Sequence, residues 1–223
     1  MVTAERPKPS PEGSVDEPME TKSVAFPLRL QLPDEWELTD ERLLELGLLN
    51  DEWYLEADCE GGLYMAPPPG PLSGERELLI ASQILSWRTT SNRGRVFPSV
   101  TFHLPNGWRR APDAAWISDE RLSGIAPDDE GIWAVCPDFV VEVRSVNDRL
   151  KPLQTKMKMW TSQGARLGWL VDPYNEDVWV YLEEGDPERL DRPESVTASE
   201  IAEDLTVDFR PIWPRQHPEP QTS

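Results

Sequence analysis

The chain has 223 residues, of which 38% are hydrophobic, and a formal net charge of −19 at pH 7. This hydrophobic content is enough for one well-buried core and marginal for two, so we expect a single domain. The apolar runs are too short for a membrane span, and the amino terminus lacks the basic and then apolar pattern of a secretion signal, so we expect a cytoplasmic protein.

Both ends of the chain are rich in proline and polar residues. Residues 1–26 contain few large apolar side chains, so ordering them would bury too little surface to offset the entropy that they would lose. Residues 209–223 are also polar and Pro-rich, although Ile212 and Trp213 could attach the start of this segment to the domain. We therefore predict two tails, of which the first is disordered, and a folded domain over 27–208.

The first half of the domain shows helix and hairpin patterns. Apolar residues at helical spacing, with Thr39 as the N-cap, predict a helix over 40–49. Two short strand patterns on either side of residues 60–62 predict a hairpin. A longer helix is predicted over 74–90, and Gly94 is expected to stop it. Its expected buried face consists of Leu78, Ile80, Ala81, Ile84, Leu85 and Trp87.

The second half combines strands with one helix. The strings VFPSVTFHL (96–104), DAAWIS (113–118) and DFVVEV (138–143) have the continuous apolar character of central strands that are covered on both faces. A helix is predicted over 150–163 with Gly164 as its C-cap, and two further strands follow it. This order predicts an α/β fold with a mixed central sheet flanked by helices.

Charge is unevenly distributed along the chain. Residues 33–60 hold 11 acidic side chains and 1 basic one, and residues 176–208 hold 12 and 2. By contrast, residues 88–117 hold five Arg and one Asp, and residues 144–166 hold six basic side chains and one Asp. The two basic segments are either solvated faces without further meaning or the walls of a basic cleft in an acidic body.

Two acidic residues, Asp113 and Glu142, lie at or inside strongly apolar strand patterns. A carboxylate in such a place is costly unless a bound cation or a basic side chain compensates it. Alternation along a strand places Arg144 on the same side as Glu142, and the following helix offers Lys156 and Lys158. The spacing alone favours a structural ion pair, and a site for a hard cation such as Mg²⁺ is the alternative.

A longer pattern surrounds these residues. The strings PDAAWIS and CPDFVVEVRSVNDRLKPLQTKMKMWTSQGARLGWLVDPYNEDVWVY join a PD step, an E-V-x-S strand, a Lys four residues before an aromatic, a Gly and a W-L-V-D-P strand. With these features, residues 27–182 resemble the Uma-type bacterial family of restriction-endonuclease-like proteins of unknown function, within the PD-(D/E)XK nuclease superfamily. The resemblance implies a restriction-endonuclease-like core that uses Mg²⁺ or Mn²⁺.

The resemblance also implies roles for individual residues. It assigns the metal-binding carboxylates to Asp113 and Glu142. The superfamily has a Lys two residues after this Glu, where this chain has Arg144, which stays charged and transfers a proton poorly. The resemblance therefore points to Lys156 as the catalytic lysine. Further candidates are Lys158 in reserve, Gln154 at a polar position of the family string, and Glu75 or Glu77 on the first long helix, where the helix dipole alone also favours carboxylates.

We therefore expect a Mg²⁺-dependent endodeoxyribonuclease with DNA as its partner. RNA is left open as a substrate, as is a homodimer. The alternative is a catalytically weak or inactive nuclease-like scaffold that binds nucleic acid or a protein partner, which Arg144 and the net charge of −19 favour. Trp108, Arg109 and Arg110 are weak candidates for nucleic-acid contact, because large aromatic side chains more often fill the core.

Overall fold

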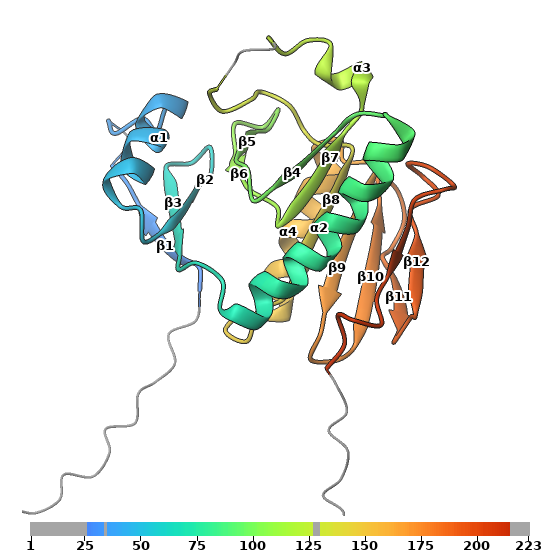
Figure 1. Cartoon of the computed structure of the whole chain (residues 1–223). Helices are drawn as coiled ribbons and strands as arrows, with labels where there is room; N and C mark the ends of the chain where they lie inside the picture. Colours follow the sequence, from blue (N-terminus) through green and yellow to red (C-terminus); the bar gives the residue numbers. More distant parts are fainter. Residues whose placement is uncertain (1–25, 34, 127–129, 215–223) are drawn as a thin grey trace, which may run out of the picture.

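The computed structural model describes residues 26–33, 35–126 and 130–214. A six-stranded sheet and a five-stranded sheet form the body of the molecule (Figure 1), and a third sheet has two strands. Residues 1–25 of the first predicted tail lie outside the described residues.

The six-stranded sheet carries the largest part of the core. Its strand order is β11-β10-β9-β8-β7-β4; β8 and β9 are parallel, and the other neighbouring pairs are antiparallel. A parallel pair needs a crossover, which here contains α4 (Leu150–Ser162). The sheet is therefore mixed, as predicted. Its strands are β4 (Arg95–Pro98), β7 (Ala114–Ile117), β8 (Phe139–Val143), β9 (Leu167–Asp172), β10 (Asp177–Leu182) and β11 (Glu188–Asp191).

Helices cover both faces of this sheet, α2 (Pro71–Ser91) on one face and α4 on the other (Figure 1). Every residue of β7, β8 and β9 is buried. Side chains alternate between the faces: Val141 packs with Ile80 and Ile84 of α2, whereas Val140 packs with Met157 of α4. The prediction of central strands covered on both faces is confirmed for β7 and β8, and β9, which was predicted only as a strand, is buried in the same way.

The N-terminal part of the chain forms the five-stranded sheet, which lies beside the large one (Figure 1). Helix α1 (Asp40–Leu49) packs on it through a small core that includes Leu43, Ala57 and Leu63. The predicted hairpin is confirmed, but a separate sheet was not predicted. In sheet order, its strands are β1 (Leu28–Gln31), β3 (Gly62–Ala66), β2 (Tyr54–Ala57), β6 (Arg109–Arg110) and β5 (Phe102–His103).

The prediction of one strand over 96–104 is wrong. Strand β4 ends at Pro98, and Ser99 has a φ of 36°, outside the range of a strand. The chain then leaves the large sheet and enters the small one as β5. This segment therefore joins the two sheets.

The helix predictions are confirmed with corrections. Helix α1 begins after Thr39, whose side chain accepts a hydrogen bond at the N-cap as expected. Helix α2 begins at Pro71 rather than at 74, because proline in the first turn gives up no helical hydrogen bond. Its Leu78 and Leu85 are 68% and 50% exposed, so their predicted burial is wrong. A short helix, α3 (Asp119–Leu122), was not predicted. No helix in the described part of the chain is long and apolar enough to cross a membrane.

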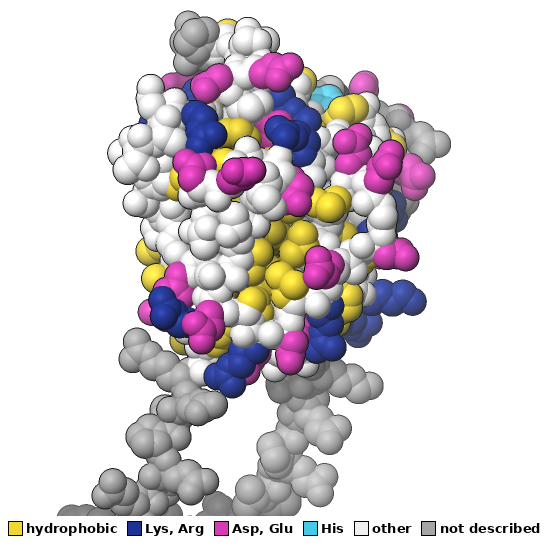
Figure 2. All heavy atoms as spheres, turned by 90° about the vertical axis from the view of Figure 1, so that its right-hand side faces the viewer, with side chains coloured by type: hydrophobic (Ala, Val, Ile, Leu, Met, Phe, Trp, Pro, Cys, Tyr) yellow, Lys and Arg dark blue, Asp and Glu magenta, His cyan; other side chains and the backbone are white. Residues whose placement is uncertain are grey.

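The C-terminal segment completes the core. Strands β12 (Ser195–Thr197) and β13 (Thr206–Asp208) pair with each other, and beyond them Phe209 and Trp213 are only 0% and 6% exposed. They pack in the same core cluster as Ile84 of α2. The predicted domain end at 208 is therefore wrong, while 215–223 lie outside the described residues. Figure 2 shows hydrophobic side chains in the middle of one face, with charged side chains around them.

Candidate functional site

Two neighbouring strands of the large sheet bring Asp113 and Glu142 together. Asp113 directly precedes β7, and Glu142 lies in β8, which pairs with β7. Asp113 is half-buried and its Oδ2 accepts a hydrogen bond of 2.6 Å from the Val143 N–H, while Glu142 is 3% exposed. The local reason is the strand pairing, which places the start of β7 opposite the end of β8. Both carboxylates thus lie at one end of the sheet.

Lys156 of α4 reaches the same place. Its Nζ lies 2.9 Å from Glu142 Oε1 and 3.0 Å from Glu56 Oε1, and it donates a hydrogen bond of 2.9 Å to the Ala111 carbonyl. Its Nζ also donates a hydrogen bond of 3.1 Å to Glu142 Oε2, so Glu142 and the Ala111 carbonyl accept its hydrogen bonds while Glu56 contacts it as an ion pair. The lysine that the family resemblance indicated is therefore fixed between two carboxylates.

Trp160 also holds the Glu142 carboxylate in place. Its Nε1–H donates a hydrogen bond of 2.9 Å to Glu142 Oε1. Residues four apart lie on the same side of a helix, so Lys156 and Trp160 hold one carboxylate together. This contact is a physical reason for a lysine four residues before an aromatic in the sequence.

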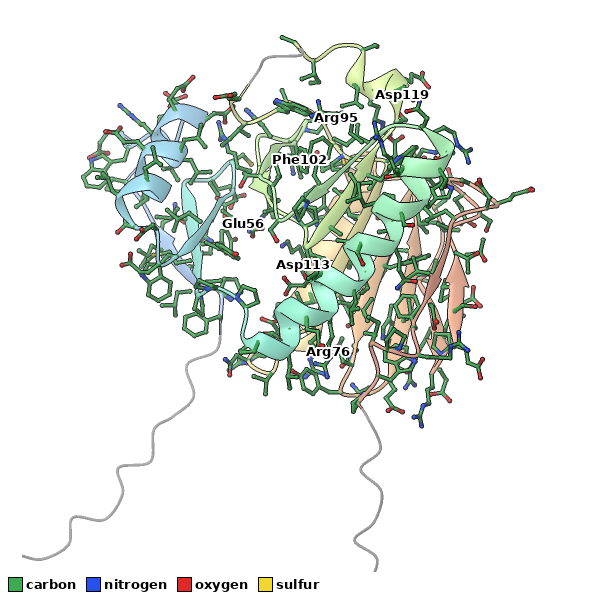
Figure 3. The ribbon with its side chains drawn as sticks, viewed as in Figure 1. Glu56, Arg76, Arg95, Phe102, Asp113 and Asp119 are labelled. Carbon is green, nitrogen blue, oxygen red and sulfur yellow. The ribbon has the colours of Figure 1, made fainter. Side chains whose placement is uncertain are left out.

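Glu56, in β2 of the small sheet, was missed by the sequence analysis. It accepts hydrogen bonds of 2.7 Å from Arg110 Nη1 and 2.9 Å from the Ala111 N–H, besides its contact with Lys156. Burial alone would raise the pKa of Glu56, but the charges of Lys156 and Arg110 and these hydrogen bonds lower it to about 2. Figure 3 shows Glu56 on the small sheet and Asp113 beside α2, in the region where the two sheets meet.

The remaining carboxylates carry surplus negative charge. Burial, and then the charge of Glu77, raise the pKa of Asp113 to about 7. The pKa of Glu142 is raised to about 8, first by burial and then by Asp113 and Glu56, against the opposing effect of Lys156. Burial, Glu142 and Asp148 raise the pKa of Glu77 to about 7. One lysine does not neutralise this group of carboxylates.

The donor set fits a hard divalent cation. Mg²⁺ binds through one or two carboxylates and keeps several waters, so Asp113 and Glu142 suffice as protein ligands. Within the described residues, no three His, Cys, Asp or Glu side chains are grouped closely enough to hold a metal by themselves. Glu77 forms no ion pair or hydrogen bond with another described residue, and its carboxylate is coupled to the site through charge alone. Asp113, Glu142 and Glu77 thus have the chemistry for a cation that needs water as well as protein ligands.

Other candidates from the sequence lie apart from this group. Arg144 pairs with Asp172 at 2.8 Å and donates to the Asp148 carbonyl, so it is held away from Glu142. Glu75 is exposed and lines a pocket of about 600 Å³ with Trp213, on a different side of α2 from Glu77. On α4, Lys158 is exposed and Gln154 is half-buried, and neither side chain contacts the site carboxylates in the described structure.

The candidates for nucleic-acid contact are engaged within the protein. Arg109 Nε lies 2.6 Å from Asp40, and Arg110 pairs with Glu56 at 2.7 Å. The guanidinium of Arg110 also lies 4.0 Å from the centre of the Tyr64 ring and 4.6 Å from that of Trp108. Their predicted role in nucleic-acid contact stays a prediction, which these internal contacts do not favour.

Known proteins resemble this chain in sequence and in fold. The model of the Uma2 family, described as "putative restriction endonuclease", matches residues 40–210. No curated protein matches the chain. Among solved structures, a "putative nuclease" from Anabaena variabilis shares the fold with a TM-score of 0.66 and 22% identity, covering 79% of this chain and 98% of that chain. The predicted family resemblance and the predicted restriction-endonuclease-like core are thereby confirmed. Because the family model matches more than half of the chain, this protein belongs to the Uma2 family.

Proposed function

We propose that this protein is a divalent-metal-dependent endonuclease that hydrolyses phosphodiester bonds of DNA. The observation that carries the proposal is the group of Asp113, Glu142 and Glu77, which holds more carboxylates than the fixed Lys156 can neutralise; burial, and then the charges of neighbouring carboxylates, raise their pKa values to about 7, 8 and 7. A purely structural ion pair needs no such surplus. The family and the shared fold support a nuclease-like protein.

Asp113 and Glu142 would hold Mg²⁺ or Mn²⁺, with Glu77 close enough to add negative charge. When bound, such a cation supplies Lewis acidity, which polarises a phosphoryl oxygen and makes water more acidic. Val143 fixes one oxygen of Asp113, and Lys156 and Trp160 fix Glu142, so the carboxylates are held in place before a ligand arrives. This preorganisation lowers the cost of binding the cation.

Lys156 would orient the attacking water and stabilise the negative charge that develops on the phosphate. It already donates hydrogen bonds to Glu142 and the Ala111 carbonyl and forms an ion pair with Glu56. A substrate phosphate would compete with these partners for the lysine. Glu56 is the partner from the other sheet, and its loss leaves Lys156 still bound to Glu142.

The proposal is tested by calorimetric titration of Mg²⁺ and Mn²⁺ and by plasmid cleavage, with the wild type and the Asp113→Ala and Glu142→Ala variants. Glu75→Gln is the control, because it removes an exposed carboxylate that does not contact the site. We expect metal binding and cleavage in the wild type and the control, and neither in the two site variants. A wild type that binds no metal would overturn the proposal.

A non-catalytic scaffold is the second candidate function. It is favoured by Lys156, which is engaged with Glu56, Glu142 and the Ala111 carbonyl, and by Arg144, which is engaged with Asp172. The same experiment separates the two functions. A wild type that binds metal and DNA but leaves both strands of the plasmid intact would support the scaffold.

A further inference from the structure

Arg76 of α2 is a buried cation without a counterion. It is 9% exposed, and its Nε donates a hydrogen bond of 3.2 Å to the Ile212 carbonyl. Its Nη1 is buried and has no hydrogen-bond partner, and no carboxylate of the described residues forms an ion pair with it. A guanidinium stays charged at any pH that the protein tolerates, so it cannot reduce this cost by losing its proton.

The energetics call for an anion at this place. A buried charge that lacks a partner is strongly destabilising, and proteins compensate such charges with a counterion or with a bound ligand. Elsewhere in the described chain, buried arginine follows this rule: Arg110, which is 5% exposed, pairs with Glu56. Arg76 departs from it, and a guanidinium fork suits the geometry of a phosphate.

An exposed aromatic ring lies against the same guanidinium. Arg76 lies 5.7 Å from the centre of the Tyr174 ring, and Arg144 lies 5.6 Å from it. Tyr174 is 46% exposed, and its N–H donates a hydrogen bond of 3.0 Å to Asp172, which fixes the start of its turn. Two cations and one solvent-accessible ring are thus gathered at one place.

This place is connected to the carboxylate site through the chain. Arg76 directly precedes Glu77 in α2, and Arg144 follows Glu142 by two residues, one position after the end of β8. Figure 3 shows Arg76 near the start of α2 and Asp113 beside the same helix. A polynucleotide carries a phosphate at every step, so a strand bound at the carboxylates extends naturally towards a second anion site nearby.

We propose that Arg76, Arg144 and Tyr174 form a second subsite for a single DNA strand, in which Arg76 binds a backbone phosphate next to the bond that is cleaved and Tyr174 stacks on a base. This inference rests on the proposed function and names a substrate contact for it. Arg144 also lies against the Tyr174 ring, and Asp172 neutralises the charge of Arg144. Base stacking on aromatic rings is tolerant of sequence, so the subsite would add affinity without specificity.

The test measures binding without cleavage. A fluorescent oligothymidylate is titrated in EDTA into the Asp113→Asn protein, whose neutral amide removes one repulsive charge, and anisotropy is recorded over a range of salt concentrations. Arg76→Gln and Tyr174→Ala are each added to this background. Arg93→Gln is the control: this arginine also lies over an aromatic ring, 5.0 Å from the centre of Trp87, but it lies beyond the C-terminal end of α2, at the opposite end from Arg76, and it pairs with Asp204.

We expect Arg76→Gln to raise the Kd about tenfold and to reduce the salt slope by about 0.7, the value for one phosphate contact to a single strand. Tyr174→Ala should raise the Kd about tenfold with an unchanged slope. Arg93→Gln should stay within about twofold of the background. Equal effects of the Arg76 and Arg93 variants, or no effect of Tyr174→Ala, would overturn the subsite.

Two features keep this test independent. Because Tyr174 is exposed, its variant stays informative if Arg76→Gln fails to fold. If the wild type cleaves no plasmid but both variants bind the oligonucleotide more weakly, then the subsite stands and the proposed nuclease activity falls. If the wild type cleaves and neither variant changes binding, then the activity stands and the subsite falls.

Discussion

A buried carboxylate lies near each end of β8. Basic side chains neutralise one of them, whereas the other lies among further carboxylates. Asp138, directly before the strand, is 2% exposed and meets Arg121 at 3.1 Å, Arg166 at 3.9 Å and the Ser118 N–H at 2.8 Å. Near the other end, Glu142 is 3% exposed and shares its surroundings with several other carboxylates and one lysine. Neutralised carboxylates hold a fold together, whereas surplus ones mark a place for a cation.

The largest expected effect comes from neutralising one aspartate at each end. Asp113→Asn should reduce plasmid cleavage roughly a thousandfold, about 4 kcal/mol of barrier, without loss of stability, because it relieves repulsion. Asp138→Asn should instead lower the free energy of unfolding by about 2 kcal/mol, because Arg121 and Arg166 lose their counterion, and folded protein should still cleave. Urea unfolding and cleavage of both variants check this. The comparison fails if the two variants change the same quantity.

The second effect is the pH dependence of stability. The pKa values of Asp113, Glu142 and Glu77 in the folded protein, about 7, 8 and 7, lie above their ordinary values. The folded state therefore binds more protons than the unfolded state between about pH 4 and 8, and stability falls as pH rises through this window. We expect a loss on the order of 3 kcal/mol between pH 5 and 8.5 in urea unfolding.

A bound cation should remove this dependence. The same unfolding series with Mg²⁺ should give a flatter profile, because the cation favours the ionised carboxylates. The Asp113→Asn variant should also be flatter, since one of the coupled groups is missing. A wild-type free energy of unfolding that rises steadily from pH 5 to 8.5 would show that the pKa values of these carboxylates are not raised in the folded protein.

A smaller effect is expected from the hydrogen bond of Trp160. Trp160→Phe removes the Nε1–H that Glu142 accepts, so it should cost about 1 kcal/mol and raise the pKa of Glu142 further. Trp169→Phe is the matched control, because this tryptophan is equally buried and its Nε1 has no hydrogen-bond partner. The difference between the two variants in urea unfolding isolates the hydrogen bond. The pH profile of cleavage should shift upward with Trp160→Phe alone.

The smallest effect is expected from Lys158, one of the three lysines of α4. Lys158 is exposed, so Lys158→Ala should change cleavage by less than about twofold. Lys156→Ala removes the cation between Glu56 and Glu142 and should reduce cleavage strongly. Initial rates of plasmid nicking at equal protein concentration check this. Equal losses of cleavage in both variants would show that Lys156 does not have the proposed role.

The sequence predicted two of the central strands, β7 and β8, and the two carboxylates that the structure brings together on them. Continuous apolar runs identify buried strands, and an acidic residue at or within such a run, such as Asp113 or Glu142, stands out against its neighbours. Lys156 followed from the family pattern rather than from periodicity. The structure brings these three residues together, and their catalytic and metal-binding roles remain the proposal above.

Glu56 could not be found in the same way. It lies within residues 33–60, which hold 11 acidic side chains and 1 basic one, so no local feature of the sequence distinguishes it. Its partners Arg110 and Lys156 are 54 and 100 positions further along the chain, and only the docking of the small sheet brings them close. The signal available was a charged residue in the middle of a predicted hairpin strand.

The end of the domain was misplaced for a similar reason. The acidic block over 176–208 and the prolines after it resemble a polar surface segment, yet single residues such as Val196, Val207 and Phe209 are buried. Short strands with one inward side chain give too weak a pattern to predict. Packing against α2 decides their place instead.

The position of Lys156 has a consequence for the molecule as a whole. One ammonium group joins Glu56 of the small sheet, Glu142 of the large sheet and the Ala111 carbonyl between β6 and β7. A ligand that draws Lys156 away from Glu56 therefore weakens the attachment of one sheet to the other. By thermodynamic reciprocity, anything that shifts the small sheet alters the affinity of the site for that ligand.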